Sequence, residues 1–186
     1  MALPQTCIDH EPGQCADLVD IAEHVLDECY RALLPLIEPQ ADGTALRAYV
    51  TMGSAGDDGV ADSLCVSFLG ASLTGGSAAG NASVALPGVR ANFQVLLRES
   101  GWPTISIEGG RITLPDPTAQ SAAARHAFAR GEALYRHLLR LNTRRQIAPM
   151  FTGAVATVGQ LTPVPPLGGV VGWRVNFDVL MGWGGG

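Results

Sequence analysis

The sequence predicts an α+β fold: a mostly antiparallel sheet with two amphipathic helices packed on one face, and long loop insertions. Two observations predict it. Apolar residues recur at three- and four-residue steps in two segments, and they alternate with polar residues in several others. The segments follow one another as helix, strands, helix and strands, without the strict strand–helix alternation of a parallel sheet. A chain of 186 residues, 47% of them apolar, is large enough for one hydrophobic core.

The chain is expected to divide into an N-terminal arm, residues 1–15, and a single α+β domain, residues 16–186. Pro4, Pro12 and Gly13 interrupt any periodicity in the arm. Its first residues lack the basic start and the apolar run of a signal peptide, so we expect the protein to work inside the cell that makes it. No segment reaches the roughly 18 unbroken apolar residues of a membrane helix, so no membrane partner is expected.

The first helix is predicted over residues 16–37. Acidic residues lie early in this segment and Arg31 lies late, as the helix dipole favours, and Pro35 and Pro39 close it. Its apolar stripe consists of Leu18, Ile21, Ala22, Val25, Leu26, Cys29, Leu33 and Ile37.

Strands are predicted over residues 45–52, 63–69 and 89–98, where apolar and polar residues alternate. Between the last two, residues 70–83 are rich in Gly, Ala and Ser, a composition typical of a flexible loop. Short strands are predicted at 104–107 and 111–114, joined by Gly109 and Gly110.

A second helix is predicted over residues 117–141, with Asp116 as N-cap and Pro117 as its first residue. We expect its apolar stripe to be Ala124, Phe128, Gly131, Tyr135 and Leu138, flanked by Ala127, Leu134 and Leu141. Strands follow at 151–159 and 170–181. Their predicted connector contains Pro163, Pro165, Pro166, Gly168 and Gly169.

Charge is distributed unevenly along the chain. Through Asp62 there are twelve acids and two arginines, a net charge of −10, whereas the remainder has ten arginines and five acids, a net charge of +5. One interpretation is chance and solvated faces. The other is a polar subunit whose acidic part meets the basic part of the next copy, because complementary surfaces set register and partner choice. The candidate contact residues are Asp17, Asp20, Asp27 and Glu28 against Arg136, Arg140, Arg144 and Arg145.

Candidates for chemistry are few. Cys7, His10 and Cys15 are the nearest approach to a zinc cluster, but no second close Cys/His pair completes it. Cys65 with His126 or His137 is a conceivable nucleophile–base pair without any local signature. We therefore expect no enzymatic activity and no cofactor.

The arginines from Arg125 to Arg145 offer a possible contact for a phosphate backbone. Aromatic stacking residues are missing nearby, and the whole chain has a net charge of −5. Specific nucleic-acid binding is therefore not expected, and a subunit interface or a solvated face accounts for these arginines better.

The order of these segments resembles the tail terminator, or tail completion, proteins of long, flexible-tailed bacteriophages. The residues that carry the resemblance are the helix 16–37, the strand Leu46–Met52, the strand that ends Val95-Leu96-Leu97-Arg98-Glu99-Ser100-Gly101-Trp102-Pro103, the Pro-started helix 117–141, and the closing strand Gly172-Trp173-Arg174-Val175-Asn176-Phe177-Asp178-Val179. The chain departs from that family by its longer loop 70–83 and its arm 1–15.

The resemblance implies a structural virion protein that forms a ring, usually a homohexamer. Such a ring caps the tail tube, stops its polymerisation and joins it to the head connector during virus assembly in the host cytoplasm. The expected partners are other copies of the chain, the tail tube protein and the head–tail connector protein. The alternatives are another neck or tail subunit, such as a head-closure or tube protein, and a small metal-binding enzyme that uses Cys7, His10 and Cys15.

Overall fold

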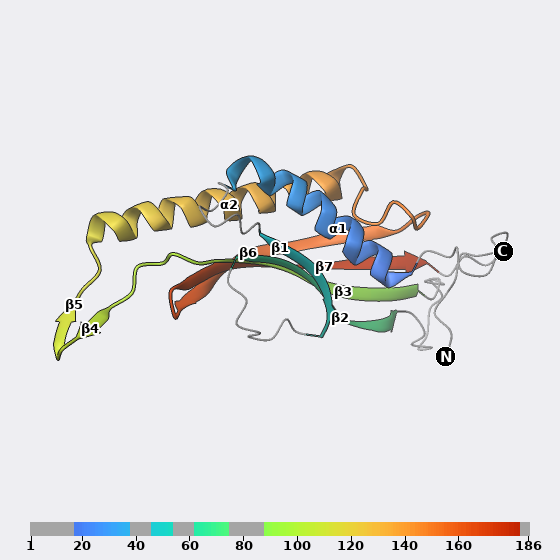
Figure 1. Ribbon diagram of the computed structural model, residues 1–186. Coiled ribbons are helices and arrows are strands. Elements are labelled where there is room, and N and C mark those ends of the chain that lie inside the picture. The colour runs from blue at the N-terminus through green and yellow to red at the C-terminus, as the bar shows by residue number, and fades with distance from the viewer. Residues whose placement is uncertain (1–16, 38–45, 54–61, 75–87, 183–186) are drawn as a thin grey trace, which may run out of the picture.

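A computed structural model describes residues 17–37, 46–53, 62–74 and 88–182 (Figure 1). Two helices and a five-stranded sheet of order β1-β2-β3-β7-β6 form the body, and a separate two-stranded hairpin, β4-β5, projects from it. The elements are α1 (Leu18–Leu33), the 3-10 turn η1 (Leu34–Leu36), β1 (Arg47–Met52), β2 (Ser63–Thr74), β3 (Gly88–Glu99), β4 (Ser106–Glu108), β5 (Arg111–Thr113), α2 (Pro117–Thr143), β6 (Val155–Leu167) and β7 (Val170–Gly182).

The α+β class and the mostly antiparallel sheet are confirmed. Three of the four pairings in the large sheet are antiparallel, and β1 pairs with β2 in parallel. Both helices lie on the same side of the sheet (Figure 1), where α1 contacts β1, β2 and β3 and α2 contacts β6 and β7.

The first helix begins with a reciprocal cap. The Asp17 carboxylate accepts from the backbone N–H of Val19 at 2.7 Å, while the Asp17 N–H donates to Asp20 at 2.6 Å. The predicted stripe is confirmed, since Ile21, Ala22, Val25, Leu26, Cys29 and Leu33 are buried. The α-helix ends at Leu33 rather than at residue 37, because Pro35 lacks the N–H that a further α-helical turn requires.

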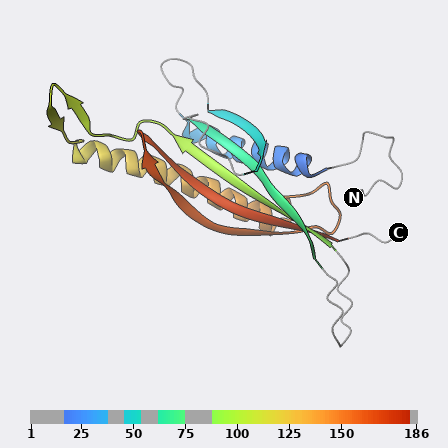
Figure 2. The same cartoon turned by 90° about the horizontal axis from the view of Figure 1, so that it is seen from below.

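The second helix has the predicted Asp116 cap and Pro117 start, but its predicted stripe is partly wrong. Ala124 and Phe128 are exposed, although the Phe128 ring makes an edge contact with Trp173 of β7. Only the start of α2 extends beyond the sheet (Figures 1 and 2). The buried residues are Ala127, Gly131, Leu134, Leu138 and Leu141.

Alternating side chains of β3 and β7 face the helices, as predicted, and form the centre of the core. Phe93 lies between Phe68 of β2 and Phe177 of β7, with ring-centroid separations of 5.5 Å and 5.0 Å. Such aromatic contacts add to the free energy of burying these side chains. This row of rings joins three neighbouring strands into one hydrophobic cluster.

Three predicted boundaries are corrected. Residues 70–74 belong to β2 and not to a flexible loop, since this small-residue segment pairs with the start of β3. The three prolines expected in a connector lie within β6, which as an edge strand can tolerate residues that lack an N–H, so only Gly168 and Gly169 make the turn. Residues 151–154 precede β6. The predicted N-terminal arm, residues 1–15, and residues 75–83 of the predicted loop lie outside the described residues.

Candidate functional site

The β4-β5 hairpin and its flanking residues, 104–115, form a projection with one apolar and one polar face. This projection is called the arm from here on and is distinct from the predicted N-terminal arm, residues 1–15. Gly109 and Gly110 have φ values of +57° and +79°, the conformation of a two-residue hairpin turn. This turn places Ile107 directly opposite Ile112. Because side chains on a strand alternate between faces, Ile105 and Leu114 are predicted on the same face, and Ser106, Glu108, Arg111 and Thr113 on the other.

The apolar face of the arm is open. Ile105, Ile107, Ile112 and Leu114 are 58%, 70%, 64% and 72% exposed. Among the described elements, β4 and β5 contact mainly each other, and the arm projects past the end of the sheet beside the start of α2 (Figures 1 and 2). Exposed apolar patches with a polar rim mark interaction sites in soluble proteins.

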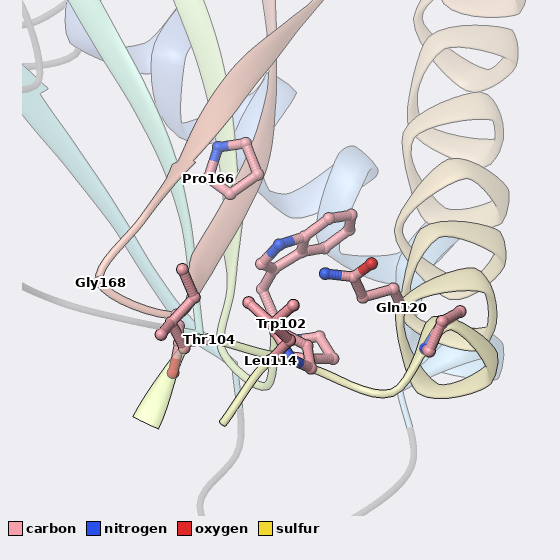
Figure 3. A pocket seen from close by; sticks show the side chains of 11 residues that line it. Trp102, Thr104, Leu114, Gln120, Pro166 and Gly168 are labelled. Carbon is pink, nitrogen blue, oxygen red and sulfur yellow. The ribbon is translucent and has the colours of Figure 1, made fainter. Parts of the chain in front are cut away.

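A pocket at the base of the arm extends this apolar surface. It has a volume of about 590 Å³ and lies between the arm, the start of α2 and the β6–β7 turn. Figure 3 shows Trp102 in it, between Pro166 and Gln120. The backbone N–H of Trp102 donates to the carbonyl of Gly169 at 2.9 Å and so holds the segment that leads into the arm against the β6–β7 turn. Ile105 and Leu114 line both the pocket and the arm, so the two surfaces are continuous.

A second open surface lies on β2, beyond the end of β1. The register pairs Met52, the last residue of β1, with Phe68. The β2 residues before Phe68 are buried, whereas Leu69, Ala71 and Leu73 are exposed. Within the described chain, no strand pairs with this far half of β2 on the β1 side. The far half of β2, residues 69–74, therefore offers aliphatic side chains and an edge to which none of the described strands is paired.

The acidic residues predicted at a subunit interface already have partners in their own chain. Asp17 and Asp20 cap α1. The Arg31 guanidinium lies 2.6 Å from Glu28 and 3.9 Å from Asp27, and His137 of α2 lies 3.4 Å from Glu28, outside hydrogen-bond geometry. These carboxylates thus have local structural reasons for their positions.

The predicted basic residues lie near the end of α2. Arg136 donates to Glu132 at 2.7 Å, one helical turn earlier. Arg140, Arg144 and Arg145 are exposed and form no ion pair within the described chain. The structure places acids and arginines on two helices of the same layer, and His24 of α1 bonds the carbonyl of Gln146 at 2.8 Å, just past the end of α2. These three arginines therefore present positive charge at the end of α2 that another molecule can contact.

Sequence reasoning missed an ion pair between the buried Glu99 and the half-buried Arg130. Arg130 donates to the Glu99 carboxylate at 2.8 Å and to the carbonyl of Leu36 at 3.1 Å, which ties β3, α2 and η1 together. Burial raises the pKa of Glu99, and the Arg130 hydrogen bond and charge counter that shift only in part. The pair has a structural role, and no local sequence pattern distinguishes these two residues from solvated charges.

The predicted Cys–His pairs are not brought together. Leu64 and Val66 face the helices, so Cys65 lies on the opposite face of β2 from His126 and His137 of α2. Cys29 is fully buried in α1, and burial raises the pKa of its thiol. Among the described residues no group of three or more His, Cys, Asp or Glu side chains is arranged to hold a metal. Cys7, His10 and Cys15 lie outside the described residues.

The arm was predicted as two short strands, but its significance was missed. The signal was present in Ile105 to Leu114, where four aliphatic residues alternate with polar ones around the Gly-Gly turn. Alternation alone predicts an apolar face and cannot say whether the chain itself covers it. None of the described helices is long and apolar enough to cross a membrane. Comparison with protein-family models and with curated protein sequences finds no match to this chain.

Proposed function

We propose that this chain is a structural subunit that assembles with copies of itself, and that it forms the terminator ring of a long bacteriophage tail. The observation that carries the proposal is the arm, which holds four exposed aliphatic side chains beyond the end of the sheet. A hairpin of two strands is marginal by itself in water, so an open apolar face on it favours a partner.

A ring requires heterologous contacts, in which one patch of a subunit meets a different patch on the next. Two different open surfaces support this: the apolar arm and the far half of β2, residues 69–74. The exposed arginines at the end of α2 add a charged surface that guides register more than it adds affinity.

The place in the virion rests on the resemblance of the segment order to tail terminator proteins. In that role the ring caps the tail tube and stops its growth, and it presents a docking surface to the head–tail connector. The proposed function needs no cofactor and no catalytic residue. The ion pair between Glu99 and Arg130 joins β3, α2 and η1.

Electron microscopy of the purified chain mixed with tail tubes tests this function. We expect single rings at one end of each tube, and tubes that no longer elongate when tube protein is added. Rings stacked along the tube would instead assign the chain as another tail subunit, such as the tube protein. A chain that never joins tube ends and stays a single copy would contradict the proposal.

A further inference from the structure

We propose that the apolar face of the arm in one copy docks on the far half of β2 in the next copy, so that subunits join head to tail. This inference rests on the proposed function and names the contact through which the assembly forms.

The apolar face of the arm is the surface that docks, called the donor surface here, and the register of the hairpin determines which residues it contains. Ile107 and Ile112 are opposite each other, Ile105 and Leu114 follow one pleat away, and all four are more than half exposed. The polar face carries Glu108 opposite Arg111, so the tip bears no net charge. A strand pair with no net charge and an exposed aliphatic face is suited to pack on or extend another sheet.

The far half of β2, residues 69–74, is the surface that receives the arm, called the acceptor surface here, and it begins where β1 ends. Gly53 donates to the carbonyl of Phe68 at 2.7 Å, and among the described strands none continues this pairing beyond it. Beyond it, Leu73 is 62% exposed and lies opposite Val89, a core residue of the helix-facing side. A strand laid beside residues 69–74 with its aliphatic side chains toward the helices would therefore continue the existing apolar face.

The acceptor cannot be reached by the arm of the same chain. Thr74 pairs with Gly88 at the start of β3, and the arm follows Glu99 at its end. The seven residues Phe93–Glu99 of β3 separate the two surfaces, which corresponds to about 24 Å at the rise of an antiparallel strand, and the arm projects away from the sheet (Figure 1). Because each copy carries the donor at one end and the acceptor at the other, a second copy can satisfy both.

The test uses the full-length chain, four variants and sedimentation velocity. Ile107→Asp/Ile112→Asp places charge on the apolar face, and Ser106→Asp/Thr113→Asp is its control on the polar face of the same strands. Leu73→Asp places charge on the acceptor, and Ser72→Asp is its control on the adjacent exposed position. Thermal unfolding checks that each variant keeps the fold, as expected at exposed positions.

We expect the arm variant and Leu73→Asp each to raise the concentration needed for half assembly by more than about tenfold, while both controls behave like the unchanged chain. An equal mixture of the arm variant and Leu73→Asp should form particles of two chains and stop there. Each such pair retains one intact arm facing one intact acceptor.

Unchanged assembly of the arm variant would overturn this inference and leave the proposed function standing, since copies would still join by another surface. Full assembly of Leu73→Asp, with no two-chain particles in the mixture, would overturn the acceptor. An unchanged chain that remains single both in solution and on tail tubes would overturn the proposed function and the inference with it.

Discussion

At the residue scale, Arg145 occupies a position that favours glycine. It has a φ of +56° just past the end of α2. The backbone N–H of Arg145 donates to the carbonyl of Asn142 at 3.0 Å, and the backbone N–H of Gln146 donates to the carbonyl of Leu141 at 2.8 Å. This pair of hydrogen bonds is the Schellman arrangement that ends many helices, usually with glycine at this position.

Arg145→Gly should therefore raise the free energy of unfolding by about 0.5–1 kcal/mol, because glycine adopts positive φ without steric cost. Urea denaturation measures the change. Arg145→Ala is the control, since it removes the same charge but keeps a β-carbon, and it should give no such gain. Equal stabilisation by both variants would attribute the effect to charge rather than to backbone conformation.

Glu99 gives a pH dependence whose sign follows from its raised pKa. A carboxyl group with a raised pKa in the folded state favours folding below its unfolded pKa, about 4.3, and this contribution is lost as pH rises through the folded pKa. Glu99→Gln has no such group. The stability of the variant minus that of the unchanged chain should therefore increase as pH rises from about 4 toward neutrality.

Chemical denaturation at a series of pH values measures this difference. Both chains share all other carboxylates, so the contributions of those groups to the pH dependence of stability cancel in the difference. A difference that falls with rising pH would mean that Arg130 lowers the pKa of Glu99 more than burial raises it.

At the element scale, close packing of α2 on β7 depends on Gly131. A β-carbon at this position would lie 2.6 Å from the indole ring of Trp173, whose N–H donates to the carbonyl of Ala127 at 2.6 Å. The ring is held by that hydrogen bond and by an edge contact with Phe128 at 5.8 Å between ring centroids.

Gly131→Ala should lower the free energy of unfolding by about 1–3 kcal/mol, as overpacking does, although alanine favours the helix itself. Thermal or urea unfolding measures the loss. In the background of Trp173→Leu, which removes the ring, the same change should be neutral or stabilising. A loss of equal size in both backgrounds would argue against the packing explanation.

Charge at the end of α2 gives a prediction that separates folding from assembly. Arg140→Glu/Arg144→Glu should leave the fold intact, because both side chains are exposed and form no ion pair within the described chain. The double variant should nevertheless assemble less well if these arginines meet acids on another copy. Circular dichroism and sedimentation velocity check the two outcomes. Loss of the fold would assign both arginines a role in their own monomer.

Elements that depend on local pattern could be predicted, and elements that depend on their neighbours could not. The alternation in β3 and β7 and the Asp116-Pro117 helix start were sufficient to place those elements. Phe128 was predicted to be buried but is 58% exposed, because periodicity does not reveal how far the rest of the molecule covers each side of a helix. The prolines of β6 were assigned to a connector, because tolerance of proline depends on the strand lying at an edge.

At the scale of the whole molecule, the candidate contact residues were chosen from charge along the sequence, and the structure adds a different pair of surfaces. The acids of α1 have partners within the chain, whereas the arm and the far half of β2, residues 69–74, are open. That pair could not be predicted, since it depends on where β1 stops and on how far the arm projects.

An elongated subunit with a donor at one end and an acceptor at the other can only form closed rings or open filaments. The angle between successive copies decides between them. The resemblance to tail terminators favours closure, and a ring would leave no unpaired arm.

The most direct test of this account is the mass of the purified chain in solution, measured by sedimentation velocity across a wide range of concentration. The account predicts a discrete particle whose mass is a fixed multiple of the 19.4 kDa chain. A sedimenting species of 19.4 kDa at every concentration, unchanged when tail tubes are added, would contradict it.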